Sequence, residues 1–423
     1  MKAIKGVTGT IRIEDIPVAR YARNTMKHPA VYENHVPTLT APVNQGLCGS
    51  CWAISTTQSL RDRLNRGRKQ MLVPELSFQF VIDCAKNCVT FEGREGCSLD
   101  CNGGFLSTSF EFLTRVGTVR DAYHPNRHDD ESGIDHIDGT SGTALACPAT
   151  IPENETLYKC IGYKNIHLYQ DMFGITNARV RPRQRPLLEL QANADNIAEE
   201  IYLHGPVAVC FNLFSDFRDF WMHPNSKNMV YQIGWKLSKA IRNTVDPVGD
   251  IRWGSQLPPK YGITFKTGHS VSIVGYGSQT NVDGEVVDYW ICRNSWGFTP
   301  NALYNGFFKI RRGINASAIE ADVCACYVAD PPPEAMQEPT VPVAAAEKPV
   351  SASPALENPV LSAAGAPNTM LDNMDSTQWN IRHNWFLPMV FMILLIIVVI
   401  YMLSKPSNTM FPLKFYAGKR LFI

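Results

Sequence analysis

The spacing of apolar side chains changes along the chain, from helical in the first half to short apolar runs in the second. Ala53 and Leu60 recur on one helical face, so we expect a helix that begins near Ser50 and carries Cys51 at its N-terminus. Ser77 is placed to cap a second helix over the apolar run that follows it.

After Gly205 the pattern becomes one of short strands broken by glycines and turn residues. The strand-like runs are PVAVCFNLF, SVSIVGYG, YWICRN and GFFKIRR. Helices therefore dominate the first half of the globular part and strands the second. We find no internal repeat.

The C-terminal region carries a long apolar segment. Residues 385–403 contain no charge, and a helix of this length, at about 1.5 Å per residue, nearly spans a bilayer core of roughly 30 Å. Pro388 falls in the first turn, where its missing amide costs little, and Trp385 and Tyr401 are placed like interfacial anchors. A buried core helix is the alternative, but no compact sequence follows, so we expect one transmembrane helix and a short basic tail over 404–423.

The segment before the predicted span, residues 331–384, has the composition of a linker. It holds nine prolines between Pro331 and Met370 and no aromatic residue in that stretch, so it cannot bury enough apolar surface to fold. We therefore expect a short N-terminal segment over 1–40, a globular domain over 41–330, and then a tether to the membrane span.

Composition narrows the classes of function. The net charge of +1 indicates no nucleic-acid partner. Twelve cysteines exceed what a cytosolic enzyme usually carries, which indicates an oxidising environment or a disulfide-bearing ancestor. The N-terminus lacks an apolar run of about 7 to 15 residues, so it does not read as a secretory signal peptide.

Cys48 and Cys51 in APVNQGLCGSCWAIS allow two interpretations. They are either a redox or metal pair, or one half of a disulfide beside one reactive thiol. A cysteine attacks a carbonyl only as thiolate, which a helix N-terminus and a nearby imidazolium favour. The second interpretation therefore requires a distant histidine and a group that orients it.

The second half of the sequence supplies candidates for these groups. His269 enters a predicted strand, and Asn294 follows on the next strand, where its amide can accept from the imidazole. Trp296 can shield that hydrogen bond from water. Gln45 and the backbone amide of Cys51 can donate to an oxyanion.

Five motifs stand in the order found in the papain family of cysteine peptidases, and the chain resembles that family over roughly residues 40–330. The motifs are QGLCGSCWA, CNGG, GPV, GHSVSIVGYG and NSWG. The resemblance implies an α+β, papain-like fold of two subdomains, with a helical half, a β-barrel half and the cleft between them. It implies a peptidase that uses no cofactor and no metal and acts on polypeptide substrates.

The resemblance also implies a role for each candidate residue. Cys51 would be the nucleophile, His269 the general base and acid, Asn294 the residue that orients the imidazole, and Gln45 the oxyanion donor. Cys48 would form a disulfide with Cys101 of CNGG, which favours the second interpretation of the cysteine pair. The residues that would contact the substrate are Gly103, Gly104, Trp296 and Asp322.

Within the family, cathepsin B is the most similar member. The segments GPVAVCFNLFSDFRDF, GFFKIRRG and AIEAD resemble its sequence. By this resemblance Asp322 lies in the pocket for the substrate side chain two residues before the cut, where it would accept arginine as well as bulky apolar groups. The alternative is a solvated surface aspartate.

The sequence departs from the family pattern in its spacing. His269 and Asn294 follow Cys51 by 218 and 243 residues, where about 130 to 150 is typical, so we expect insertions, one of them roughly over residues 232–267. The second Trp-Gly expected after NSWG is replaced by FTPNALYN.

Two further groups of residues leave alternatives open. His124 and His128 belong to a metal site, to a counterpart of the cathepsin B loop that caps the cleft, or to a solvated loop. Cys210 and Cys292 lie in apolar strands as small core residues. Further disulfides can form among Cys84, Cys88, Cys97, Cys147 and Cys160.

The sequence thus predicts a cysteine peptidase that is tethered to a lipid bilayer through residues 385–403. The alternative is a catalytically inactive, papain-like structural membrane protein. A C-terminal span without a signal peptide resembles the papain-like proteins of large DNA viruses. The side of the membrane stays open, because a tail anchor favours a cytosolic peptidase, whereas the basic tail favours a luminal one.

Overall fold

A computed structural model describes most of the globular part of the chain. The described residues are 1–4, 7–12, 15–18, 28–32, 39–91, 94–127, 146–166, 187–245, 256–281, 284–297 and 306–337. All of them belong to one of the chain's two units, Met1–Thr340. The predicted membrane span and tail lie outside them, as does most of the predicted linker. Within the described ranges, no helix has both the length and the apolar character needed to cross a bilayer.

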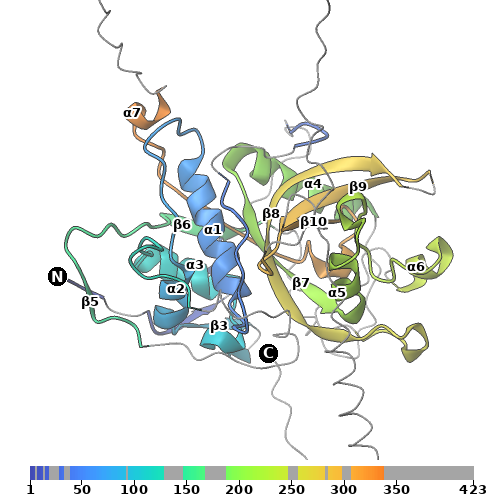
Figure 1. The fold of residues 1–423 in the computed structure, drawn as a ribbon, viewed down its shortest axis with the longest axis horizontal. Coiled ribbons are helices and arrows are strands. Elements are labelled where there is room, and N and C mark those ends of the chain that lie inside the picture. Colours follow the sequence, from blue (N-terminus) through green and yellow to red (C-terminus); the bar gives the residue numbers. More distant parts are fainter. Residues whose placement is uncertain are drawn as a thin grey trace, which may run out of the picture. The chain divides into compact units, whose positions relative to one another are not determined.

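The two helices predicted for the first half are confirmed, as α1 Cys51–Asn65 and α2 Phe78–Cys84. A third helix that was not predicted, α3, spans Leu106–Arg115. The Ser77 hydroxyl accepts a hydrogen bond from the backbone N–H of Phe80 at 2.9 Å, so it caps α2 as expected. Figure 1 shows α1 between the other two helices and the main sheet.

The four predicted strands are confirmed and, with two that were not predicted, form one six-stranded sheet in the order β10-β9-β8-β7-β11-β6, in which every neighbouring pair is antiparallel. Its strands are β6 Gly162–Asn165, β7 Val207–Phe214, β8 Phe265–Thr280, β9 Val286–Arg293, β10 Phe307–Arg311 and β11 Asp322–Tyr327. One face packs into an aromatic core that includes Phe211, Trp221 and Trp290.

The remaining elements are short strands and peripheral helices. The strands are β1 Lys2–Ala3, β2 Thr10–Arg12, β3 Cys88–Phe91, β4 Arg94–Cys97 and β5 Thr150–Ile151. The α-helices are α4 Leu187–His204, α5 Ser215–Trp221, α6 Lys239–Val245 and α7 Pro333–Met336. The 3-10 turns are η3 Asp100–Asn102, η5 Ser226–Asn228, η6 Pro259–Tyr261 and η7 Ala316–Ala318.

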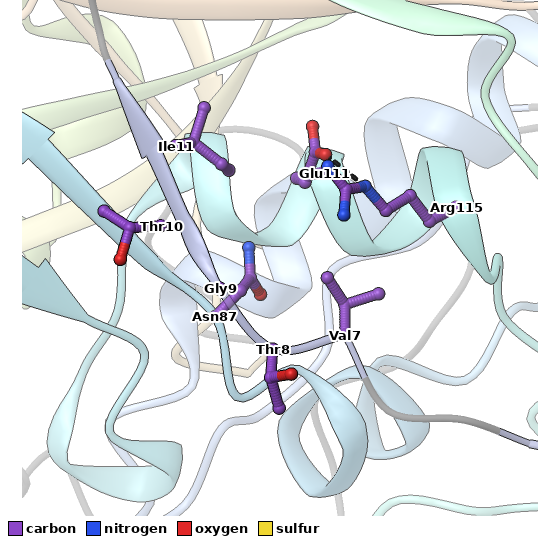
Figure 2. A pocket seen from close by; sticks show the side chains of 8 residues that line it. All are labelled: Val7, Thr8, Gly9, Thr10, Ile11, Asn87, Glu111 and Arg115. Carbon is purple, nitrogen blue, oxygen red and sulfur yellow. Dashed lines mark ion pairs between the residues drawn. The ribbon is translucent and has the colours of Figure 1, made fainter.

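The first residues of the chain join the sheets of the helical half. Strand β1 pairs with β5, and β2 pairs in parallel with β3. Figure 2 shows a small pocket beside this segment, where Glu111 and Arg115 form an ion pair one turn apart on α3. None of its lining residues belongs to the predicted site.

Ordered structure also reaches past residue 330. Helix α7 lies within the segment whose composition indicated a linker, and its Ala335 is buried. The backbone carbonyl of Ala335 accepts hydrogen bonds from the amides of Lys69 and Gln70. These contacts tie the first turn after the domain to the loop that follows α1.

The twelve cysteines, all in the described part of the chain, divide evenly between disulfides and free thiols. The disulfides are Cys48–Cys101, Cys84–Cys147 and Cys88–Cys97. The free thiols are Cys51, Cys160, Cys210, Cys292, Cys324 and Cys326. The structure therefore contains the Cys48–Cys101 pair that the family resemblance implies, with Cys51 free.

A buried ion pair joins the two halves of the domain behind the site. Arg293, at the end of β9, donates to Asp62 of α1 at 2.7 Å and to the backbone carbonyl of Thr40 at 2.8 Å. Both charged side chains are almost completely buried, so loss of either partner would leave an uncompensated charge. The contact fixes the strand that leads to Asn294 against the helix that begins at Cys51.

Candidate active site

Cys51 is the first residue of α1 and is partly exposed. The loop before it is held close to the chain at Cys101, because the Gly49 amide donates to the Cys101 carbonyl at 2.7 Å. A side chain at position 49 would place its Cβ only 2.5 Å from that carbonyl oxygen, so the close approach requires glycine. Together with the Cys48–Cys101 disulfide, this contact fixes the N-terminus of α1.

Two opposing effects act on the Cys51 thiol. Burial, the larger effect, raises its pKa above the ordinary value. Hydrogen bonds from the Ser270 backbone and hydroxyl and from the Trp52 and Cys51 amides lower the pKa. These donors do not offset burial by themselves, so a thiolate at neutral pH needs a further positive charge, which a protonated histidine can supply.

The structure joins His269 to Asn294 as predicted. His269 lies on β8, and its Nε2 is 2.8 Å from Oδ1 of Asn294. The same Oδ1 accepts the backbone N–H of Ser295 at 2.9 Å, which identifies it as the amide oxygen. Nε2 therefore carries a hydrogen, and Nδ1 is left to exchange a proton with a thiol.

Trp296 covers the histidine. The indole stacks on the His269 ring with centroids 4.9 Å apart and an interplanar angle of 28°. Only 5% of Trp296 is exposed, and Phe217 contacts it edge-on from the core side. This arrangement agrees with the predicted shielding of the imidazole–amide hydrogen bond; a direct contact of Trp296 with substrate stays a prediction.

Gln45 is buried and held at both ends of its side-chain amide. Its Nε2 donates to the Cys48 carbonyl at 2.9 Å, and its Oε1 accepts the Ser295 hydroxyl at 2.5 Å. The backbone N–H of Gln45 also donates to the Ser295 carbonyl at 2.8 Å. An amide nitrogen has two hydrogens, so one remains for the predicted oxyanion role.

Gly103 and Gly104 follow the disulfide of CNGG and pack close to α1. Gly103 has φ of 109°, which favours glycine, and a Cβ on Gly104 would lie 2.6 Å from the Trp52 indole. Both glycines thus have a structural reason to be present. Their contact with substrate stays a prediction.

Asp322 is not a solvated surface residue, so that alternative is wrong. It begins β11 and pairs directly with Cys210 of β7, which in turn pairs with Ser270 of β8. Oδ1 of Asp322 is buried without a hydrogen-bond partner among the described residues. Burial raises the pKa of this carboxyl to about 7.

The neighbouring acid has a different role. Glu320 is buried and accepts from the Trp290 indole at 2.9 Å and from the Asn315 amide at 2.9 Å. It also accepts from the Gly313 amide at 2.6 Å. Glu320 therefore holds the turn before β11, whereas Asp322 keeps an oxygen for which the described residues supply no partner.

The structure places His124 away from a capping or metal-binding role. Its Nε2 lies 2.8 Å from Oδ2 of buried Asp83, and its backbone carbonyl accepts the Ser77 hydroxyl at 2.5 Å. These two hydrogen bonds hold His124 against α2 and the Ser77 residue that caps it. His128 lies outside the described residues. The one metal-like cluster found in the described ranges contains Cys88 and Cys97, which already form a disulfide.

Three residues near the predicted site were not singled out for it. Ser270 pairs with Cys210 across β8 and β7 and acts on the Cys51 thiol, and Ser295 orients Gln45. Cys210 is partly buried and packs against the core of the helical half, and Cys292 is buried in the core as expected. Because side chains alternate along a strand, the sequence could have predicted that Ser270 and His269 lie on opposite faces of one strand. The pairing of that strand with β7 could not be predicted from the sequence.

Comparison with known proteins agrees with the motifs and the geometry. A family model described as "Papain family cysteine protease" matches residues 32–240 and 259–327. The chain belongs to the papain family of cysteine proteases. The gap in the match overlaps the insertion expected before His269.

Curated relatives in this family include cathepsin B-like proteins. "Cathepsin B-like protease 1" of Arabidopsis thaliana is 29% identical over 280 residues, which are 66% of this chain and 56% of that protein. "Cathepsin B-like CP3" of Giardia intestinalis is 28% identical over 281 residues, covering 66% and 67%. The chain thus spans little more than half the length of the Arabidopsis relative.

Proteins with lower sequence identity also match the chain. "Pro-cathepsin H" of Bos taurus is 26% identical over 312 residues, covering 73% of this chain and 67% of that protein. Among solved structures, "proCathepsin B S9 from Trypanosoma congolense" matches with a TM-score of 0.45 and 18% identity, covering 74% of this chain and 82% of that chain.

Proposed function

We propose that the protein hydrolyses peptide bonds, with Cys51 as nucleophile and His269 as the group that carries the proton. The observation that carries the proposal is the hydrogen bond between His269 and Asn294 under the Trp296 indole, one residue along β8 from Ser270, which lowers the pKa of Cys51. Membership of the papain family supports the same chemistry.

The reaction follows from the positions of these groups. The Cys51 thiolate attacks the carbonyl carbon, and the oxyanion accepts hydrogen bonds from Gln45 Nε2 and the Cys51 amide. His269 then gives its proton to the leaving amine, which departs and leaves a thioester. Water attacks the thioester while His269 takes its proton, and the acid product leaves.

A peptide assay tests this proposal. The purified protein should cleave short peptides with a fluorescent leaving group under reducing conditions, and a thiol-directed epoxide should abolish the cleavage. Hydrolysis that persists at full rate after the epoxide has reacted would assign the activity to another group. No hydrolysis of any peptide in a varied library would favour an inactive structural protein.

We further propose that Asp322 selects arginine two residues before the cleaved bond. Its buried Oδ1 has no hydrogen-bond partner among the described residues, and a guanidinium would supply one. Its cross-strand neighbour Cys210 is partly buried and pairs with Ser270 of β8, which acts on the Cys51 thiol. The cross-strand neighbours Ser270, Cys210 and Asp322 therefore lead from the neighbourhood of Cys51 to the buried carboxyl oxygen of Asp322.

Replacing Asp322 with asparagine should lower the preference for arginine over phenylalanine in a matched peptide pair. A charge-assisted hydrogen bond is worth about 1.5 to 3 kcal/mol, so the ratio of the two kcat/KM values should fall roughly ten- to hundredfold at pH 8. The measurement is this ratio, and the rate for the phenylalanine peptide serves as the internal control.

The same ratio should depend on pH in the wild-type protein. Because the pKa of Asp322 is raised to about 7, the carboxyl of the empty pocket is neutral below that pH and charged above it. The preference for arginine should therefore grow as the pH rises through about 7, and it should stay flat in the Asp322→Asn protein. A ratio that the substitution leaves unchanged would place Asp322 outside the substrate pocket.

We also propose that residues 385–403 tether the peptidase to a membrane. What supports this is the charge-free apolar segment after a proline-rich linker. The resemblance to papain-like proteins of large DNA viruses belongs to the same proposal, because it rests on this arrangement. The full chain should stay with membranes after alkaline carbonate extraction, and a chain ending at residue 384 should not. Release of both would contradict a tether.

A further inference from the structure

The side of α1 that faces β8 carries hydroxyl groups and the Cys51 sulfur. Cys51, Ser55 and Ser59 follow one another at four-residue spacing, so they lie on one side of the helix. The Ser272 hydroxyl of β8 donates to the Ser55 carbonyl at 3.1 Å, and the Ser59 hydroxyl donates to Ser272 Oγ at 3.3 Å. These contacts fix the level of Ser272 along the helix.

Ser270 occupies the same face of β8, two residues before Ser272, because side chains alternate along a strand. Two residues of strand advance by about 6.6 Å, close to the roughly 5.4 Å of one helical turn. Arg63, near the end of α1, donates to the carbonyl of Pro206, the residue before Val207, and Val207 pairs with Ile273, so later residues of β8 lie toward the end of the helix. Ser270 therefore lies one turn nearer the start of α1, at the level of Cys51. Only 3% of Ser270 is exposed, and its side chain acts on the Cys51 thiol to lower the pKa of that group.

We propose that the Ser270 hydroxyl donates a hydrogen bond to the Cys51 thiolate and is part of the catalytic machinery. The inference rests on the proposed function, since it gives Ser270 a role in forming the attacking species. A hydroxyl that donates to an anion stabilises the anion relative to the neutral thiol. Ser270 thereby assists the imidazolium of His269 in keeping the buried sulfur ionised.

The Ser270 hydroxyl has two sulfurs beside it, because it acts on the pKa of Cys210 as well as on that of Cys51. Cys210 lies directly opposite on β7, and burial raises the pKa of its thiol well above the ordinary value, so Cys210 stays neutral. Beyond it, Asp322 becomes negative as the pH rises through about 7 and raises the pKa of Cys210 further. His269, the residue before Ser270 on β8, is the group that can carry positive charge in the proposed mechanism. The hydroxyl and the imidazolium thus oppose the effect of burial on Cys51.

The direction of the effect follows from these charges. Donation to the thiolate lowers the pKa of Cys51, so removal of the hydroxyl should raise it. The thiolate would then become protonated at a higher pH than in the wild type, and the acid limb of the pH–activity profile would move to higher pH. We expect a shift of about one pH unit, equivalent to about tenfold in the thiolate fraction on that limb.

The test is the rate at which iodoacetamide alkylates Cys51 as a function of pH. It is read by peptide mass spectrometry in the full chain, so that Cys51 is distinguished from Cys210. Ser270→Ala should shift the alkylation midpoint and the acid limb of kcat/KM upward together. Ser272→Ala is the matched control, because it removes a hydroxyl from the same face one helical turn away, and it should leave both midpoints in place.

A second pair of variants guards against a packing effect. Ser270→Thr keeps a hydroxyl and should titrate like the wild type, whereas Ser270→Val has the same shape without the hydroxyl and should titrate like Ser270→Ala. Superimposed profiles for threonine and valine, or equal shifts in Ser270→Ala and Ser272→Ala, would overturn the inference. A Cys51 that is alkylated no faster than Cys210 in the wild type would overturn the proposed function as well.

Discussion

Replacing Cys51 with serine should reduce kcat/KM for peptide hydrolysis by at least about a thousandfold. A hydroxyl at the start of α1 has no lowered pKa and does not form the ion pair with His269 that the site requires. The loss should appear at every pH at which the wild type is active, with the melting temperature unchanged. Peptide turnover and thermal melting of both proteins are the measurements.

Cys48→Ser is the matched control, because it removes a sulfur three residues away from the same loop. It breaks the disulfide to Cys101 and should lower the stability by about 2 to 5 kcal/mol, while the folded fraction keeps a thiol that can be labelled. A folded Cys48 variant that loses labelling beside a Cys51 variant that keeps it would reverse the assignment.

His269→Ala should cost much more activity than Asn294→Ala. Without the imidazole, no group can take the thiol proton or protonate the leaving amine, a role usually worth about 10² to 10⁴ in rate. Asn294 acts through its 2.8 Å hydrogen bond to His269, and the stacked Trp296 still limits the ring when the amide is gone. We expect Asn294→Ala to retain readily measurable turnover.

The pH profiles of these two variants separate their roles. Asn294→Ala should keep a bell-shaped profile with shifted limbs, since its imidazole still titrates, and His269→Ala should lose the limb that the imidazole contributes. Equal losses and identical profiles in two correctly folded variants would argue against separate roles for the two residues.

Local signals in the sequence predicted several elements correctly. The Ser77 hydroxyl caps α2 because capping depends on residues three positions apart. The start of α1 at Cys51 was likewise predictable. The sequence predicted one apolar face for α1, but the buried surface of the helix is wider than that face. The helix lies between two packed halves and buries polar positions such as Ser59 and Asp62 as well.

Other elements depend on partners far away in the chain. Strand β1 has two residues and exists because it pairs with β5, about 150 positions later, so no alternating pattern marks it. The partner of Cys84 is Cys147, with a separation of 63 residues, and spacing alone left that pairing open. Both are properties of the folded chain and not of a local segment.

The residues of the candidate site also divide into those that local sequence motifs predict and those whose role depends on partners far away in the chain. Cys51, His269 and Asn294 were found because their chemistry needs a nucleophile, a base and an orienting group in known family motifs. The contribution of Ser270 depends on the register of β7, β8 and β11, which sets Asp322, Cys210 and Ser270 side by side. Sequence placed Asp322 near the substrate by resemblance, whereas its unpartnered oxygen and raised pKa follow from burial.

The most direct test of the account is to locate the covalent adduct of a peptidyl epoxide. The wild-type protein should gain the mass of one inhibitor, peptide mapping should place it on Cys51, and hydrolysis should stop in proportion to labelling. The Cys51→Ser protein should gain none under the same conditions, although its five other free thiols remain. An adduct on one of those thiols, or full labelling of Cys51 with hydrolysis unchanged, would contradict the assignment of Cys51 as the nucleophile.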